Sequence, residues 1–192
     1  MLLDLYLVIQ TQVEILPKKK YMNSNQLTKE EYSSFYSPYI AALDNVNLLE
    51  ELEISVHRLI KFVQDIPMDK FDYIYAEGKW TIKDILQHLI DAERIFCYRA
   101  LRFARKDKTP LPGFEENGYA IVAEGSKRSI MELLTELAIV RQATLSLFKT
   151  FSDDILVLTG TASENQMSVR AIGFVIIGHQ NHHQRIFEER YL

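Results

Sequence analysis

The sequence predicts an all-α protein built as a bundle of four long helices. Glycine and proline account for only 7 and 5 of the 192 residues, and they cluster in a few places. Between these places, apolar residues recur with the spacing that lines one face of a helix. No segment alternates between apolar and polar residues as a half-buried strand does. Because the breaks between the helices are short, we expect neighbouring helices to run antiparallel.

The first long helix is expected over residues 47–65, where apolar side chains form one stripe and Pro67 follows the end. Before it, Thr28 and Glu31 have the spacing of a capping box, in which each side chain satisfies a backbone amide at a helix start. Pro38 interrupts the segment that follows. We therefore expect a short helix and a turn ahead of the bundle.

The second and third long helices begin at similar patterns. Thr81 with Asp84 predicts the start of a helix that runs to about Arg105. Residues 107–118 then contain two prolines and two glycines, which predicts a break. The third helix is expected to begin near Ser129, again with a glutamate three residues later.

The last part of the chain predicts one loop and one helix. The third helix is expected to end near Phe151, and the polar residues 152–167 predict a loop. The fourth helix is expected to start after Ser168 and to reach almost to Leu192. Helices of this number and length fit a single domain.

The net charge and the cysteine content of the chain indicate which partners and which cell compartment to expect. The net charge is −4 and the isoelectric point about 5.8. This argues against nucleic acid as a partner, because proteins that bind nucleic acid present a basic face. Cys97 is the only cysteine, so no internal disulfide forms. A single thiol suits a reducing compartment, and we expect the protein in the cytoplasm.

The first 21 residues differ from the rest of the chain. Residues 1–16 are largely apolar, but polar residues interrupt them and three lysines follow, which fits neither a secretory signal nor a membrane span. Three interpretations remain: an extra helix or strand packed on the domain, an interfacial anchor, or translation that starts at Met22. Composition shifts at Met22, which favours the last. Residues 22–192 would then be the single domain, and residues 1–21 would lie outside the native protein.

Histidines are concentrated in the fourth helix. His179 and His183 are four residues apart, so they lie about 40° apart around the helix axis and share a face. That face is the apolar stripe, which points into the bundle. His182 lies about 80° from the axis of the stripe and points sideways. Two imidazoles therefore enter the core side by side.

A third histidine completes a candidate metal site. Adjacent buried imidazoles are unfavourable unless something satisfies them, and a divalent cation is the commonest solution. His88, on the inward face of the second helix, offers a further ligand. Three histidines from two helices leave at least one coordination position open, as catalytic zinc sites do. We therefore predict a site for zinc or nickel formed by His88, His179 and His183.

The alternative for each of these residues is a hydrogen-bonded core histidine, which is the commoner role of a single inward histidine. The HxxxH spacing also lacks the glutamate of the HExxH motif, so a zinc protease is not predicted. Convergence of the three rings in the folded chain separates the two interpretations.

Four stretches of the chain match one known pattern. The first, at residues 77–94, is EGKWTIKD followed by His88 and DAER. The second and third are PLPGF at residues 110–114 and TGTA at residues 159–162. The fourth, at residues 178–192, is GH followed by His183 and ERYL. Through these stretches the chain resembles the DinB/YfiT-like family of metal-binding helical proteins, from about Glu30 to its end. Residues 1–21 lie outside the resemblance.

The resemblance implies a specific site and a broader range of reactions. Such proteins are four-helix bundles with a mirror variant of the up-and-down topology. They bind a divalent metal through one histidine on the second helix and two on the fourth, which correspond here to His88, His179 and His183. Characterised relatives include thiol-dependent S-transferases and a mycothiol-dependent isomerase, which makes a low-molecular-weight thiol a candidate cofactor. Dimers are common among them, so the resemblance implies a homodimer.

Further residues are candidates for substrate binding or for orienting a ligand, and no catalytic residue is assigned. Arg99 lies about 20° from His88 around the helix and could bind a substrate carboxylate, although a surface ion pair is the commoner role. Asp91 could accept a hydrogen bond from a ligand imidazole, and His182 could support the ligands in the same way. Glu93 is expected on the solvent side, paired with a basic side chain.

These features predict a metal-dependent enzyme that acts on a small molecule by thiol S-transfer or by hydrolysis. The loop at residues 114–117 could close over the metal and supply a general base. The main alternative is a non-catalytic bundle of stress-response type, in which the metal stabilises the fold. Binding of DNA is suggested only by the family name, and the acidic composition argues against it.

Overall fold

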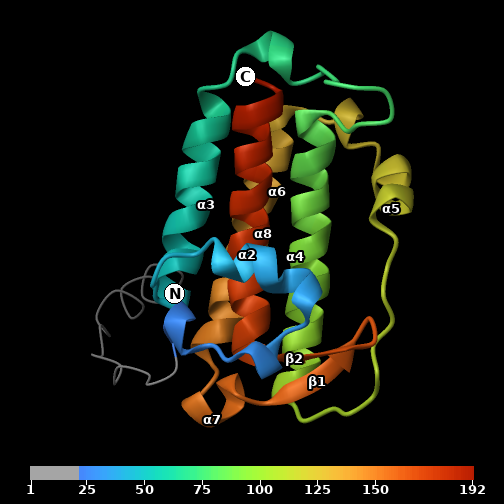
Figure 1. Cartoon of the computed structure of the whole chain (residues 1–192). Coiled ribbons are helices and arrows are strands. Elements are labelled where there is room, and N and C mark those ends of the chain that lie inside the picture. The colour runs from blue at the N-terminus through green and yellow to red at the C-terminus, as the bar shows by residue number, and fades with distance from the viewer. Residues whose placement is uncertain (1–21) are drawn as a thin grey trace, which may run out of the picture.

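The computed structural model describes residues 22–192 (Figure 1). The expected N-terminal segment, residues 1–21, lies outside the described residues. The bundle consists of the four long helices α3 (Leu48–Gln64), α4 (Ile82–Ala104), α6 (Ile130–Lys149) and α8 (Val169–Arg190). Each begins and ends within a few residues of its predicted bounds, so the four-helix bundle is confirmed. No helix within residues 22–192 is both long and apolar enough to cross a membrane.

Side chains at the predicted caps fix where the helices start. The amide of Asp84 donates to Oγ1 of Thr81 at 3.1 Å, and the amide of Thr81 donates back to Oδ2 of Asp84 at 3.1 Å. Ser129 and Glu132 form the same reciprocal pair at the start of α6. Ser168 caps α8 by accepting a hydrogen bond from a backbone amide. Because these caps satisfy amides that the first helical turn leaves without partners, the helix starts follow from local sequence.

The order of the helices around the bundle differs from their order in the chain. α4 packs against α6 and α8, and α3 packs against the same two helices, so α3 and α4 lie on one diagonal (Figure 1). The amide of Ser126, just before α6, donates to Asp84 in the first turn of α4, and Arg141 pairs with Glu93 further along both helices. α4 and α6 are therefore parallel. The expectation of purely antiparallel neighbours is wrong here, because the chain returns outside the bundle along residues 105–129 instead of making a short turn.

Four short elements were not predicted: α5 (Glu116–Ala123), α7 (Asp153–Leu156), β1 (Thr159–Ala162) and β2 (Asn165–Ser168). The two strands form an antiparallel hairpin. Its turn residues Ser163 and Glu164 both have positive φ, 50° and 63°, as a type I′ turn demands. Asn-Gly is the usual signal for this turn, and Ser-Glu does not provide it. Gly160 lets β1 lie on α4, because a Cβ there would be 2.1 Å from the ring of Phe103.

Residues 22–47 form a strap that precedes α3 and packs on α8. The capping box of Thr28 and Glu31 is present, but it starts only a 3₁₀ turn, and the short α2 (Ser37–Ala41) follows. Further 3₁₀ turns are Ser24–Gln26, Ser34–Tyr36, Met68–Lys70 and Gly125–Lys127. An ion pair of 2.5 Å between Glu31 and Arg170 holds the strap to the first turn of α8.

α2 crosses α8 at a glycine next to the candidate site. A Cβ on Gly178 would lie 2.4 Å from the carbonyl oxygen of Tyr39. A larger residue would push the strap away, so the glycine allows the close approach of the two backbones. The approach places Tyr39 beside His179, where their ring centroids are 5.5 Å apart.

Buried polar residues divide the core into two apolar clusters. One cluster, toward the hairpin, includes Phe103, Phe148 and Phe174, and the other, toward the opposite end, includes Leu59 and Phe187. Between them lies a set of buried polar side chains, called the polar layer below. It consists of Ser55 on α3, His88 and Glu93 on α4, Arg141 and Thr144 on α6, and His179, Gln180 and His183 on α8. All four bundle helices therefore contribute to the level at which the candidate site lies.

Candidate metal centre

Three histidine rings meet in the polar layer between α4 and α8. Nε2 of His179 lies 3.0 Å from Nε2 of His88 and 3.1 Å from Nε2 of His183. The candidate ligand atoms all lie within 4.8 Å of one another, and each residue is 8% exposed. The fold thus brings the predicted trio together, from two helices, at one point.

The arrangement suits a cation better than hydrogen bonding alone. A ring nitrogen carries either one proton or one in-plane lone pair, so Nε2 of His179 cannot make two full hydrogen bonds at once. Nδ1 of His183 is buried and has no hydrogen-bond partner among residues 22–192. In contrast, two nitrogens bound to one zinc ion at about 2.0–2.1 Å are themselves about 3.3 Å apart. Spacing and residue type therefore fit a divalent ion held by three histidines.

Burial keeps the three rings neutral. It lowers the pKa of His88 to about 4 and the pKa of His183 to about 3. The pKa of His179 lies well below its ordinary value, first because of burial and then because of repulsion from the neighbouring histidines. Neutral imidazole is the form that binds metal, so the rings are in the ligand form at neutral pH.

Aromatic side chains support the ligand rings. The ring centroid of Trp80, which precedes α4, lies 4.9 Å from that of His88. Tyr39 and Phe96 pack against the ring of His179 from α2 and α4. These contacts restrict the rotation of the imidazoles, so the trio is positioned by packing as well as by helix geometry.

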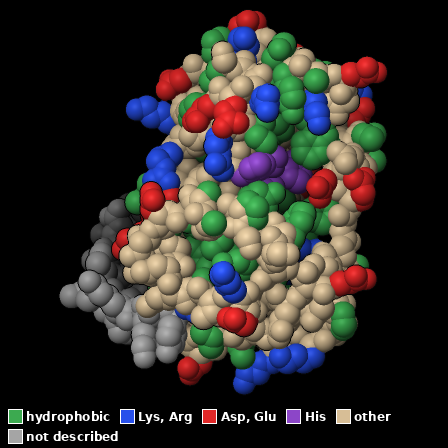
Figure 2. Space-filling view, in the orientation of Figure 1, with side chains coloured by type: hydrophobic (Ala, Val, Ile, Leu, Met, Phe, Trp, Pro, Cys, Tyr) green, Lys and Arg blue, Asp and Glu red, His purple; other side chains and the backbone are tan. Residues whose placement is uncertain are grey.

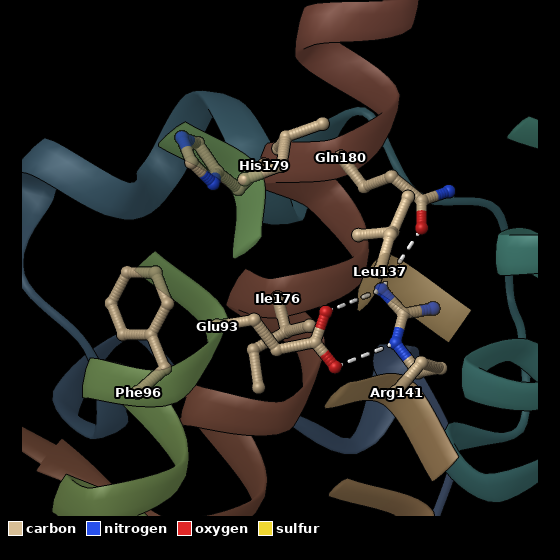
Figure 3. Close-up of a pocket in the computed structure, with 8 residues that line it drawn as sticks. Glu93, Phe96, Leu137, Arg141, Ile176, His179 and Gln180 are labelled. Carbon is tan, nitrogen blue, oxygen red and sulfur yellow. Dashed lines mark hydrogen bonds and ion pairs between the residues drawn. The ribbon is translucent and has the colours of Figure 1, made fainter. Parts of the chain in front are cut away.

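A second buried group in the polar layer is centred on Arg141, and Figure 3 shows its contacts with Glu93 and Gln180. Every N–H donor of Arg141 has an acceptor at 2.8–3.0 Å: both carboxylate oxygens of Glu93, Oε1 of Gln180, Oγ of Ser55 and the carbonyl oxygen of Leu52. Glu93 is only 3% exposed. The expectation that it faces solvent is wrong, because its cationic partner lies on another helix and compensates the charge inside the bundle.

A small cavity of about 10 Å³ is lined both by members of this network and by His179 of the histidine trio. Figure 3 shows the side chains that line the cavity, with the ring of His179 apart from the pair of Glu93 and Arg141. The apolar part of its wall consists of Leu89, Phe96, Leu137 and Ile176. The volume is close to the minimum that accommodates one water molecule.

A larger pocket of about 200 Å³ opens beside His183. The apolar part of its wall consists of Tyr75, Trp80, Ile85, Ile186 and Tyr191. Lys79 and Asn117 are its polar members besides the histidine. Figure 2 shows histidine side chains in a hollow on this face of the molecule. A small molecule can therefore reach the histidine cluster from solvent.

Arg99 has a different role from the expected surface ion pair. The residue is 2% exposed, and its Nη2 donates to Oγ of Ser163 at 2.9 Å and to the carbonyl oxygen of Pro112 at 3.1 Å. It therefore ties the hairpin turn and the outer connection to α4. The surface interpretation is wrong because both segments fold over this face of the helix. A role in substrate binding stays a prediction.

Asp91 and His182 lie at the edge of the site. Oδ1 of Asp91 accepts a hydrogen bond from Nε2 of Gln87 at 3.0 Å, and among residues 22–192 its bonds do not reach a ligand imidazole. His182 is half-buried beside α2, with its ring centroid 5.2 Å from that of Tyr39. It does not belong to the convergent trio. For both residues a supporting role stays a prediction.

The loop expected to close over the metal contains the start of α5. The carboxylate of Glu115 caps this helix, because it accepts hydrogen bonds from the amides of Asn117 at 3.0 Å and Gly118 at 2.6 Å. Asn117 is the residue that reaches the pocket beside His183. The segment thus presents an amide to the pocket, and Glu115 is engaged in capping.

A solved structure has the same fold. YfiT from Bacillus subtilis, described as "a probable metal-dependent hydrolase with an unusual four-helix bundle topology", matches with a TM-score of 0.65 and 16% sequence identity. The match covers 74% of this chain and 82% of that chain. At this level of identity the likeness shows the fold alone.

Two curated relatives share parts of the sequence. A "putative metal-dependent hydrolase" of Oceanobacillus iheyensis is 28% identical over 74 residues, which are 38% of this chain and 42% of the relative. A protein of Bacillus cereus with the same description is 27% identical over 62 residues, or 32% and 35% of the two chains. The chain therefore matches less than half the length of these relatives.

The family follows from a longer match. The model of the DinB superfamily matches residues 51–187, which is well over half of the chain. The matched region runs from α3 into α8 and contains all three convergent histidines. The chain therefore belongs to the DinB superfamily.

Proposed function

We propose that this protein is a divalent-metal-dependent hydrolase of a small molecule, with His88, His179 and His183 as the metal ligands. The observation that carries the proposal is the convergence of three neutral Nε2 atoms at 3.0 and 3.1 Å beside a pocket of about 200 Å³. Structural zinc sites are closed by four protein ligands, whereas catalytic sites keep a position open. Within residues 22–192 no further ligand-type residue joins the trio.

The ion and the chain have separate tasks. A bound zinc or nickel ion supplies Lewis-acid activation of water or of a thiol at neutral pH. The chain holds three imidazoles in neutral form, supports them with aromatic rings and walls the pocket with apolar side chains. The names of the two curated relatives support hydrolysis as the reaction.

The pocket suggests the class of substrate. Tyr75, Trp80 and Tyr191 favour a flat or apolar group between them. Lys79 also lines this pocket, and it makes no ion pair within residues 22–192. We propose a substrate that carries an apolar part and an anionic group, the latter next to Lys79.

Thiol S-transfer is the second candidate, and the pocket wall favours it in one respect. Among the described residues, no carboxylate lines the pocket beside His183. Activation of a water by a general base would need such a group, whereas a thiol loses its proton outright on binding a metal. A low-molecular-weight thiol would then be the co-substrate.

The test begins with protein purified without an affinity tag. We expect elemental analysis to find one zinc or nickel ion per chain. The loaded protein should turn over model esters that carry a carboxylate, and His179→Ala should abolish this activity. His57→Ala is the control, because this histidine is exposed on α3 and lies outside the trio, and it should retain activity.

Three outcomes separate the hypotheses. Turnover that requires an added thiol would assign S-transfer in place of hydrolysis. Equal rates for the wild type and His179→Ala would contradict both. A saturated ion with a fourth protein ligand would favour a non-catalytic, stabilising metal.

A further inference from the structure

The two nitrogens of His179 have different surroundings. Nε2 meets His88 and His183, whereas Nδ1 has no hydrogen-bond partner among residues 22–192. If Nε2 binds the metal, the ring proton is on Nδ1. A metal-bound histidine almost always donates that N–H to a carboxylate, a carbonyl or a water. The Nδ1–H of His179 therefore needs an acceptor on the side of the ring that faces away from the trio.

Two side-chain oxygens on the wall of this cavity have an acceptor site left, and only one of them belongs to a charged group. Its polar wall members besides His179 are Glu93, Arg141 and Gln180. Arg141 offers no acceptor. Oε1 of Gln180 accepts one hydrogen bond from Arg141 at 2.9 Å and has a second lone pair, but a charged carboxylate oxygen is a stronger acceptor than this neutral amide. Oε1 of Glu93 accepts from Nε of Arg141 at 2.8 Å and from Oγ1 of Thr144 at 2.6 Å.

The two carboxylate oxygens of Glu93 differ in the number of hydrogen bonds that they accept, and Oε2 accepts fewer. It accepts only from Nη2 of Arg141, at 3.0 Å, among the described residues. A carboxylate oxygen has two lone-pair sites, so Oε2 can accept one more hydrogen bond. Direct contact with His179 is not made, because the cavity of about 10 Å³ lies between the two side chains. One water molecule fits a space of this size and needs two or more polar partners.

We propose that one buried water accepts the Nδ1–H of His179 and donates to Oε2 of Glu93. Glu93 is then a positioning residue, which orients a metal ligand through the water and is itself fixed by Arg141. This inference rests on the proposed function, since it assigns Nε2 of His179 to the metal. The role predicted for Asp91 from the sequence belongs, in the folded chain, to a carboxylate two residues further along α4.

The most direct test is a crystal structure of the zinc-loaded full chain at a resolution that shows ordered water. We expect one water in the cavity, within hydrogen-bond distance of both Nδ1 of His179 and Oε2 of Glu93. A cavity without water would overturn the proposal, and so would a direct hydrogen bond between the two side chains.

A zinc titration tests the functional consequence. Glu93→Gln should weaken zinc affinity by about 10–100-fold, as expected when the partner of a metal-bound imidazole is changed. Thr144→Val is the matched control, because it removes a hydrogen bond to the other carboxylate oxygen and leaves Oε2 and the cavity. Like Glu93→Gln, the metal-free Thr144→Val variant should be less thermally stable than the wild type. Its zinc affinity, however, should stay within about 3-fold of that of the wild type.

A spectroscopic measurement separates positioning from general destabilisation. In the cobalt-loaded protein, Glu93→Gln should shift the visible absorption bands, while Thr144→Val should leave them unchanged. Should Glu93→Gln not fold, the double variant Glu93→Met with Arg141→Met removes the carboxylate without leaving a buried charge unpaired. The same loss of affinity is expected there.

Each outcome has one meaning. Absence of zinc binding in the wild type would refute the proposed function, and with it the inference. Zinc binding by the wild type with equal affinities for Glu93→Gln and Thr144→Val would refute the inference alone.

Discussion

Two buried polar groups share one level of the bundle, and they differ in how completely their hydrogen bonds are made. Around Arg141, every donor meets an acceptor on one of the helices that surround it. In the histidine trio, one nitrogen faces two others, and Nδ1 of His183 has no partner among residues 22–192. The hydrogen bonds of Arg141 are all made within the protein, whereas those of the histidine trio are not.

This difference distinguishes a structural group from a binding site. A buried polar group without a partner costs free energy, so a fold that keeps such groups in a cluster needs a ligand to satisfy them. The network around Arg141 joins all the bundle helices and fixes their relative positions. The trio, supported by this network, presents three Nε2 atoms to one point.

The largest expected effect comes from breaking the complete group. Arg141→Met leaves the carboxylate of Glu93 buried without its cation, which should lower the free energy of unfolding by about 3–5 kcal/mol. Chemical denaturation of the metal-free protein measures this. Arg58→Met is the control, since Arg58 pairs with Glu51 from a half-exposed position and should cost less than about 1 kcal/mol. Equal losses for the two variants would contradict the structural role of the network.

A fall in pH should destabilise the protein through the buried histidines of the trio. An unfolded histidine has a pKa of about 6.5, whereas burial lowers the pKa of His88 to about 4 and of His183 to about 3 in the folded chain. The unfolded state therefore binds more protons between these values, so stability is complete above pH 6.5 and declines as the pH falls.

Between pH 7 and pH 5 the metal-free protein should lose about 2 kcal/mol for each of these two histidines. Denaturation curves at both pH values check this, above the range in which most carboxylates titrate. The pKa of His179 is lowered as well, so three buried histidines contribute, and a replacement of His88 by alanine should remove about a third of the decline. A decline of the same size in that variant would show that other groups are responsible.

A bound metal should give the three Nε2 atoms a common partner. Zinc at 100 times its dissociation constant should add about 2.7 kcal/mol to the free energy of unfolding. Thermal melts with and without zinc measure the gain, and His179→Ala should lose it. In the metal-free state the same variant should cost little, because it removes a group whose hydrogen bonds are incomplete. A large loss of stability without zinc would mean that the trio is structural.

The smallest effect is expected for Asp91, whose hydrogen bond goes to Gln87 and not to a ligand. Asp91→Asn should change zinc affinity by less than about 2-fold, in contrast to Glu93→Gln. Competition with a chelator measures both variants under the same conditions. A large loss of affinity in Asp91→Asn would restore Asp91 as the residue that orients a histidine.

Local patterns predicted most of the fold. The capping boxes at Thr81 and Ser129 fixed two helix starts, since they act within one turn. The parallel course of α4 and α6 depends on where residues 105–129 pack, which no local pattern records. The hairpin was missed because Ser163 and Glu164 adopt positive φ without the usual turn residues.

For the site, helix geometry placed His179 and His183 correctly because both lie on one helix. Glu93 was misplaced for the opposite reason: its burial depends on Arg141, and the two residues come together only in the folded bundle. The sequence does contain a signal for this buried pair, because Glu93 and Arg141 each interrupt the apolar stripe of a helix. The homodimer and the thiol cofactor implied by the resemblance stay predictions.

X-ray absorption at the zinc edge of the loaded, tag-free protein tests the central claim most directly. We predict three imidazole nitrogens and one further light atom at about 2.0–2.1 Å from the ion. Fewer than three imidazoles in the first coordination sphere would contradict a centre formed by His88, His179 and His183.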